Sequence, residues 1–372
     1  MSVSPAGKGS VDSPAASPDD GAAVIFGCAG VALSAEERAL FRDVRPWGFI
    51  LFARNIGDPD ELLGLTDALR DAAGWHAPIL IDQEGGRVAR LRGPLWRDWP
   101  PVGQWCAAAD AGDLDEAALQ EALRLRYALK GAELRAIGVD VNCAPLLDLR
   151  LQGYHEIMGD RALGETPAVV GPRAKAVAEG LEQAGVLPVV KHLPGHGRAL
   201  VDSHHDLPTV DAARETLSET DFAAFKPLAG AALGMTAHVV YEAVDAQSPA
   251  TLSAAVVSDV IRGEIGFDGL LMTDDVGMGA LSGSEPEKAR GSLAAGCDVV
   301  LHCSGDVAGM AAAEPGLSAL SAEGRRRSER ALAERAAGAG NRIDIAAAET
   351  RLTELTGWRA GSPTAPILGS AP

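Results

Sequence analysis

The chain has few cysteines, little positive charge and no long apolar run. Its five cysteines include no CxxC pair, which argues against a disulfide framework or zinc knuckle and predicts reduced thiols. Lysine and arginine number 33 against 51 acidic residues, and a net charge of -18 argues against a nucleic-acid or anionic-membrane partner. Because no apolar run reaches about 18 residues, no membrane span is predicted.

Both ends of the chain lack the features of a packed or targeting segment. Residues 1–21 are small, polar and proline-bearing, without the apolar stretch of a secretory signal, so we expect a disordered tail and a cytoplasmic protein. Residues 359–372 are expected to form a second unpacked tail. Since 47% of the whole chain is hydrophobic, residues 22–358 are expected to form one domain with a large core.

Short apolar runs alternate along the chain with longer segments rich in Ala, Leu, Glu and Arg. This alternation indicates parallel βαβ units. About eight such units favour an α/β fold of the TIM (β/α)8 barrel type over a doubly wound sheet. No GxGxxG turn follows the first run, which weakens a dinucleotide-binding alternative. The strands are expected in the runs that begin at Ala23, Trp47, Pro78, Val139, Val186, Gly234, Gly269 and Cys297.

Two of the helical segments, residues 60–72 and 114–138, are amphipathic. We expect them to cover the barrel with their apolar faces. Their arginines are therefore predicted to lie on the solvated face.

Polar side chains stand where several of the expected strands end. Asp82 closes one run, Lys191 and His192 close another, and Asp274 closes a third. The carboxyl ends of barrel strands meet at one mouth, where barrel enzymes carry out their chemistry. A single polar residue after a strand is often only a helix N-cap. Its repetition over several strands favours an active site.

One polar segment, "KHLPGHGRALVDSHHD", holds half of the eight histidines: His192, His196, His204 and His205. A zinc site is one interpretation, because His192 and His196 are four residues apart. A proline and a glycine between them prevent a regular helix, so this interpretation loses its geometry. A metal site assembled across several loops stays open as an alternative.

Asp202 and His204, in the same segment, are predicted to form an acid/base pair. Side chains two apart in an extended loop share one side. A carboxylate beside an imidazole fixes its tautomer and raises its basicity. The alternative is that Asp202 forms an Asx turn and His204 is a solvent-exposed loop histidine.

A nucleophile and sugar-binding groups can be placed at the same mouth. A carboxylate nucleophile must be held rigidly, and Asp274 or Asp275 offers one. Because adjacent side chains diverge, only one of these two is expected to face the mouth. A buried Asp82 can accept two hydrogen bonds from a vicinal diol, and Arg161 can donate hydrogen bonds.

The segment "IDQEGGRVARLR" contains two adjacent glycines, Gly85 and Gly86, followed by several arginines. The glycines are expected to let the backbone approach a ligand closely. For Arg87 and Arg90 we favour structural ion pairs over ligand binding.

In this order, the motifs resemble the family 3 glycoside hydrolases, and in particular the single-barrel bacterial β-N-acetylhexosaminidases. The matching blocks include "IDQEGGRVARLR", "GDRALGE", "VVKHLPGHGRALVDSHHDLP" and "GFDGLLMTDDVGMGAL", and they span the chain from Val24 to Cys303. The resemblance implies that Asp274 is the nucleophile, which forms a covalent glycosyl-enzyme with net retention. It assigns the acid/base role to the Asp202 and His204 dyad.

The same resemblance assigns sugar binding to Asp82, Arg161, Lys191 and His192. It implies an exo-acting β-N-acetylglucosaminidase of cell-wall recycling, which removes N-acetylglucosamine from 1,6-anhydro-N-acetylmuramyl peptides. No metal or organic cofactor is implied, and the expected partner is a small glycan or muropeptide bound by a monomer. The alternatives are a β-glucosidase or glycoside phosphorylase, a metal-dependent hydrolase, and a non-catalytic barrel that binds muropeptide fragments.

Overall fold

Eight parallel strands close into a barrel in the computed structural model, which describes residues 21–151, 153, 158–203, 205–359 and 361. Each of the eight predicted runs contributes one strand, which confirms the predicted fold class. Around the barrel the order is β1, β13, β12, β9, β7, β6, β3 and β2. The strands are β1 (Val24–Phe26), β2 (Gly48–Leu51), β3 (Ile79–Ile81), β6 (Val141–Asn142), β7 (Leu187–Leu193), β9 (Leu233–Thr236), β12 (Leu270–Asp275) and β13 (Val299–His302).

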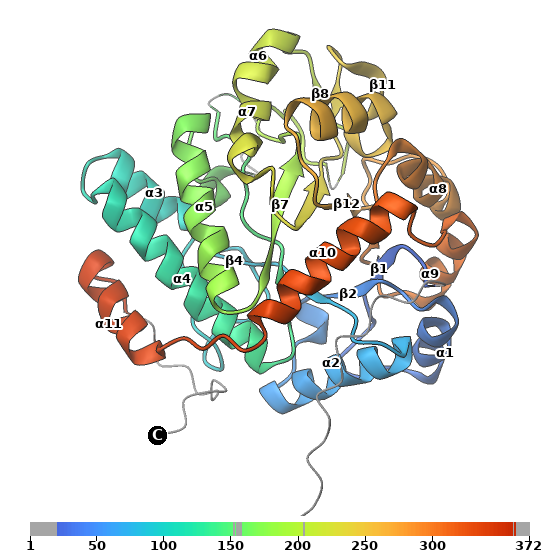
Figure 1. Cartoon of the computed structure of the whole chain (residues 1–372), viewed down its shortest axis with the longest axis horizontal. Coiled ribbons are helices and arrows are strands. Elements are labelled where there is room, and N and C mark those ends of the chain that lie inside the picture. The colour runs from blue at the N-terminus through green and yellow to red at the C-terminus, as the bar shows by residue number, and fades with distance from the viewer. Residues whose placement is uncertain (1–20, 152, 154–157, 204, 360, 362–372) are drawn as a thin grey trace, which may run out of the picture.

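Helices follow the strands and surround the barrel (Figure 1). In the described part of the chain, none of them is both long and apolar enough to cross a lipid bilayer. The longer helices are α1 (Ala35–Val44), α2 (Pro59–Ala73), α3 (Val102–Asp110), α4 (Glu116–Ala136), α5 (Pro167–Gln183), a helix over Val256–Glu264, α8 (Glu285–Ala295), α10 (Ala322–Gly338) and α11 (Ile345–Thr356). Shorter ones are α6 (Arg214–Glu219), α7 (Asp221–Phe225) and α9 (Val307–Ala313).

Two small sheets lie outside the barrel. A hairpin of β4 (Gln83–Gly85) and β5 (Val88–Ala89) follows β3 directly. A three-stranded sheet joins β8 (Thr209–Val210), β10 (Val240–Tyr241) and β11 (Asp245–Pro249), which come from the connections after β7 and β9.

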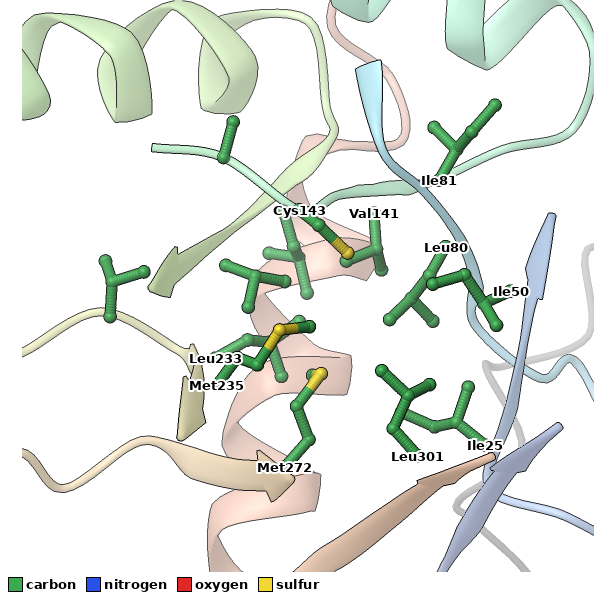
Figure 2. Close-up of a cluster of buried hydrophobic side chains, with 14 of the residues drawn as sticks. Ile25, Ile50, Leu80, Ile81, Val141, Cys143, Leu233, Met235, Met272 and Leu301 are labelled. Atoms are coloured by element: carbon green, nitrogen blue, oxygen red, sulfur yellow. The ribbon is translucent and has the colours of Figure 1, made fainter. Parts of the chain in front are cut away.

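Apolar side chains fill the inside of the barrel. Figure 2 shows this cluster, whose members are almost fully buried and come from strands all around the ring. Each buried Leu, Ile or Met contributes roughly 1.5–3 kcal/mol relative to an exposed one. Because this core is packed, a ligand site must lie above it, at the strand ends. The cluster includes Ile25, Ile50, Leu80, Val141, Met235, Met272 and Leu301.

The two predicted amphipathic segments form α2 and α4, but one expectation about their arginines is wrong. Arg126 of α4 is fully buried, whereas Arg124 keeps 34% of its side chain exposed. The guanidinium of Arg126 lies over the rings of Trp105 and Trp99, at 4.7 and 5.4 Å from their centroids. These aromatic rings and nearby carbonyls replace the water that the prediction assumed.

Residues 1–20 and 362–372 of the predicted tails lie outside the described residues. Near the C-terminal boundary, Trp358 stacks on Trp99 with ring centroids 4.4 Å apart and contacts Trp105 edge-on. The chain is therefore packed at least as far as Trp358.

At the amino end of the barrel, Asp298 joins two strands to two helices. It precedes β13, and its Oδ2 accepts the Leu271 N–H of β12 at 2.9 Å. The same carboxylate binds Arg262 at 2.8 Å and Arg327 of α10 at 3.0 Å. Asp298 is buried, and a buried charge needs partners. The two arginines and the strand N–H supply them.

Asp140 repeats this arrangement before β6. Its Oδ1 accepts the Ile79 N–H of β3 at 2.8 Å, and its Oδ2 binds Arg70 of α2 at 3.0 Å and Arg335 of α10 at 3.3 Å. Helix α10 thus contacts the carboxylates before β6 and β13 and crosses the amino end of the barrel (Figure 1).

We predict that Asp298→Ala lowers the free energy of unfolding by about 3 kcal/mol, because it leaves a buried strand N–H without its acceptor and removes the carboxylate that pairs with two partly buried arginines. Urea unfolding followed by circular dichroism would measure this loss. Asp268→Ala is the matched control, because Asp268 also binds Arg327 but is 48% exposed. It should cost less than about 1 kcal/mol. Equal losses in the two variants would contradict the role of burial.

Candidate active site

A pocket of about 310 Å³ opens at the carboxyl end of the barrel. It is lined by residues at or just after the carboxyl ends of β2, β3, β7, β9, β12 and β13, together with Arg161 and neighbouring loop residues. Every predicted sugar-binding residue and the predicted nucleophile line this one pocket, namely Asp82, Arg161, Lys191, His192 and Asp274. Of the predicted acid/base pair, Asp202 is described but does not line the pocket, and His204 lies outside the described residues.

The hairpin after β3 brings two carboxylates to two cations. Asp82 and Glu84 are two residues apart in extended backbone, so their side chains share one side. Lys191 Nζ lies 2.9 Å from Asp82 Oδ1 and 2.8 Å from Glu84 Oε1. Arg161 donates two parallel hydrogen bonds of 2.9 Å to Glu84, the fork geometry that suits a carboxylate.

All four groups are charged; Glu84 and Lys191 are buried, and Asp82 and Arg161 keep only 16% and 10% of their side chains exposed. Burial alone raises the pKa of Asp82 and Glu84, but the adjacent cations outweigh it and hold both pKa values below their usual range. Burial lowers the pKa of Lys191 and Arg161, and the carboxylates more than reverse that shift. The cluster therefore presents fixed ion pairs rather than a proton donor.

Glu84 closes the same apolar run as Asp82 in the sequence, but no binding role was predicted for it. The predicted ion pair of Arg90 is present, with Asp82 Oδ2 at 3.0 Å. Arg87 lies 3.4 Å from Asp160 at the surface and also lines the pocket.

The paired glycines lie close to other parts of the protein. A Cβ on Gly85 would meet Arg126, and one on Gly86 would meet Pro101 at 2.7 Å. Both glycines have positive φ, at 111° and 58°. They let the hairpin lie close to other parts of the chain.

Asp148 is the second residue that the prediction missed. It is fully buried, and its Oδ2 accepts a hydrogen bond of 2.7 Å from His192 Nδ1. Its Oδ1 accepts the His196 N–H at 2.6 Å. Burial alone raises the pKa of Asp148, but His192 and His196 lower it by more, so the net shift of the pKa is downwards. The carboxylate thus fixes the ring of His192 at the pocket wall.

Asp274 and Asp275 both line the pocket. The pairing of β12 with β13 shifts register between Met272 and Asp275, which breaks regular alternation at the strand end. Asp275 Oδ1 accepts the N–H groups of Gly277 and Cys303 at 2.9 and 3.0 Å. Its carboxylate is therefore held by backbone.

Asp274 differs from its neighbour in its contacts. Among the described residues, its carboxylate accepts one hydrogen bond, from Asp275 N at 2.8 Å, and forms no ion pair. Burial raises its pKa, but His192, His238 and that N–H lower it more, so the net shift is downwards. Asp274 is therefore an ionised carboxylate at the pocket, and among the described residues most of its lone pairs have no donor.

His238, two residues after β9, binds the main chain at the end of β12. Its Nε2 donates to the Asp275 carbonyl at 2.9 Å, and its Nδ1 lies 2.7 Å from Thr251 Oγ1. Burial lowers the pKa of this buried imidazole, which favours the neutral ring.

The loop that follows β7 is attached to the pocket wall through Ser203. His196 Nε2 lies 3.0 Å from Ser203 Oγ, and both residues line the pocket. The Asp202 carbonyl accepts the N–H groups of His205 and Asp206, which closes a turn. His205 is exposed.

The metal alternative finds no support in the residues that can be placed. Within the described ranges, no three His, Cys, Asp or Glu side chains gather as metal ligands. His192 and His196 stand edge to face at 5.8 Å, each held by other protein groups.

Taken together, the barrel and the acids and bases at its mouth define a TIM-barrel enzyme. Residues 23–331 match the family described as "Glycosyl hydrolase family 3 N terminal domain". The chain belongs to this family and is a glycoside hydrolase, as the motifs predicted.

Several known proteins are similar over most of the chain. A β-hexosaminidase of Alkalilimnicola ehrlichii is 41% identical over 284 residues, 75% of this chain and 80% of the relative. One of Chromobacterium violaceum is 39% identical over 284 residues, again 75% of this chain and 78% of the relative. NagZ of Neisseria gonorrhoeae, solved in complex with N-trifluoroacetyl-D-glucosamine, is 29% identical with a TM-score of 0.79, covering 90% of this chain and 98% of NagZ.

We predict a pH dependence of stability that originates at His196. Burial, together with His192, lowers its pKa to about 4, from about 6.5 in the unfolded chain. Between these values the unfolded chain binds the proton and the folded chain does not. The free energy of unfolding should therefore fall by up to roughly 3 kcal/mol between about pH 6.5 and pH 4, with no contribution above pH 6.5.

Urea unfolding of the wild type and His196→Gln over this range would isolate the effect. The Gln amide can reach Ser203 as Nε2 does but does not titrate. The stability advantage of the wild type should shrink as the pH falls. Parallel pH curves for the two proteins would rule out His196 as the source.

Proposed function

We propose that the protein is a retaining, exo-acting β-N-acetylglucosaminidase that removes terminal N-acetylglucosamine from peptidoglycan fragments such as anhydro-muropeptides. The observation that carries this proposal is the Asp274 carboxylate, ionised at the pocket and, among the described residues, bonded only to the N–H of Asp275. The names of the relatives, β-hexosaminidases, support the activity. The N-acylated glucosamine bound by the Neisseria NagZ supports the sugar.

In the proposed reaction, Asp274 attacks the anomeric carbon and forms a glycosyl ester while the glycosidic bond breaks. The leaving oxygen takes a proton from the imidazolium of His204, whose charge Asp202 stabilises. The neutral imidazole then accepts a proton from water, which hydrolyses the ester and releases the sugar with retention. Asp274 returns as a carboxylate.

The sugar would be held by Asp82, Arg161, Lys191 and His192. Lys191 uses two of its three N–H groups on Asp82 and Glu84, which leaves one for a hydroxyl. The fixed ion pairs keep these side chains in place before substrate arrives, which limits the entropy lost on binding. We further propose that the enzyme acts as a cytoplasmic monomer on a small glycan, without a cofactor and without nucleic-acid or membrane partners.

We predict that Asp274→Asn reduces kcat by roughly 10⁴-fold or more while the circular dichroism spectrum stays unchanged, because the amide is a poor nucleophile. Release of nitrophenol from para-nitrophenyl N-acetylglucosaminide would measure kcat of the variant and the wild type. The same assay with the glucoside, and with and without phosphate, would test the sugar preference and phosphorolysis. A wild type that prefers the glucoside, or that forms a sugar phosphate, would contradict the proposed function. A fluorinated N-acetylglucosaminyl donor should label Asp274, as seen by peptide mapping.

His204→Ala tests the proposed acid/base residue. The variant should lose far more activity on para-nitrophenyl than on dinitrophenyl N-acetylglucosaminide, because dinitrophenolate departs without protonation. The comparison of kcat/KM for the two substrates measures this difference. Equal losses on both would count against His204 as the acid.

A further inference from the structure

The Glu84 main-chain carbonyl accepts three donors from a single helix. Arg126 Nη2 and the Tyr127 hydroxyl lie 3.3 and 3.2 Å from it, and Lys130 Nζ donates to the same oxygen. All three residues come from α4, and all are buried. A carbonyl oxygen has two lone pairs, so three donors exceed what one backbone acceptor ordinarily takes.

The two cations in this group have little charge compensation. No ion pair to Arg126 or Lys130 occurs among the described residues, and Arg126 Nε and Nη1 are buried there without a hydrogen-bond partner. The faces of Trp99, Trp105 and Tyr127 surround them. Burial lowers the pKa of Lys130 well below its usual value and that of Arg126 to about 10. Such burial destabilises a fold, and replacement by apolar groups is often neutral or stabilising.

Glu84 connects these cations to the pocket. Its carbonyl is bound to α4, while its carboxylate holds Lys191 and Arg161 at the pocket wall. Gly85 permits the contact, because a Cβ there would collide with Arg126. A shift of the Glu84 backbone would therefore move the partners that Lys191 and Arg161 depend on.

We propose that Lys130, Arg126 and Tyr127 are positioning residues for substrate binding. None of them lines the pocket. They fix the main chain of Glu84, which fixes the two cations that hold the sugar. This inference rests on the proposed function, in which Lys191 and Arg161 bind the sugar.

Lys130→Met is the decisive variant, because it removes the donor and the charge but keeps most of the volume. We expect about a tenfold rise in KM for para-nitrophenyl N-acetylglucosaminide and in the inhibition constant of N-acetylglucosamine. This rise is smaller than the roughly hundredfold loss expected when a positioned group moves by about 1 Å. The kcat should change little, and the urea midpoint should stay unchanged or rise. A structural role alone would instead lower the midpoint and leave KM in place.

Two further variants keep the test decisive. Tyr127→Phe removes only the hydroxyl donor and should raise KM about fivefold, so it answers the question if Lys130→Met does not fold. Arg124→Met, on the outer face of α4 and paired with Glu179, should change neither KM nor kcat. An unchanged KM in both Lys130→Met and Tyr127→Phe would overturn the inference.

The wild-type assay separates this inference from the proposed function. If the wild type cleaves only the glucoside, the proposed sugar is wrong. The ratio of variant to wild-type KM on the glucoside then still decides whether Lys130 positions the site.

Discussion

The buried ammonium of Lys191, held between Asp82 and Glu84, is the interaction on which the active-site end of the barrel depends. An unpaired cation at this depth would cost several kcal/mol, and the carboxylates after β3 offset the cost of burying it in β7. The same hairpin binds Arg161, which belongs to the segment after β6. Three connections that are distant in sequence are therefore fixed together by one set of charges. The proposed sugar-binding groups are part of the stability of the fold.

The two ends of the barrel use buried carboxylates in different ways. At the amino end, Asp140 and Asp298 each accept hydrogen bonds from one strand N–H and two arginines. These contacts stabilise strands and helices. At the carboxyl end, Asp274 is ionised but has one hydrogen bond among the described residues. This difference in occupancy distinguishes a structural carboxylate from one that is available for chemistry.

Much of this arrangement could be predicted from the sequence, because it follows from local patterns. Apolar runs bounded by turns indicated all eight barrel strands, and their polar ends indicated that Asp82, Lys191, His192 and Asp274 share a pocket. Asp148 could not be found this way, because it comes six residues after the end of β6 and acts through residues of β7 and the following turn. The burial of Arg126 depends on tryptophans from another segment, which no helical periodicity reveals. Pairings between distant segments were the part that local patterns could not supply.

The position of α10 in the chain has a consequence for how the molecule is made. The arginines that complete Asp140 and Asp298 belong to this helix, so they leave the ribosome after all eight strands. Until then the emerging barrel carries two acids at its amino end that lack these counterions. During synthesis the nascent chain should therefore stay loosely closed, and the barrel should tighten only when the segment through Arg335 has been released.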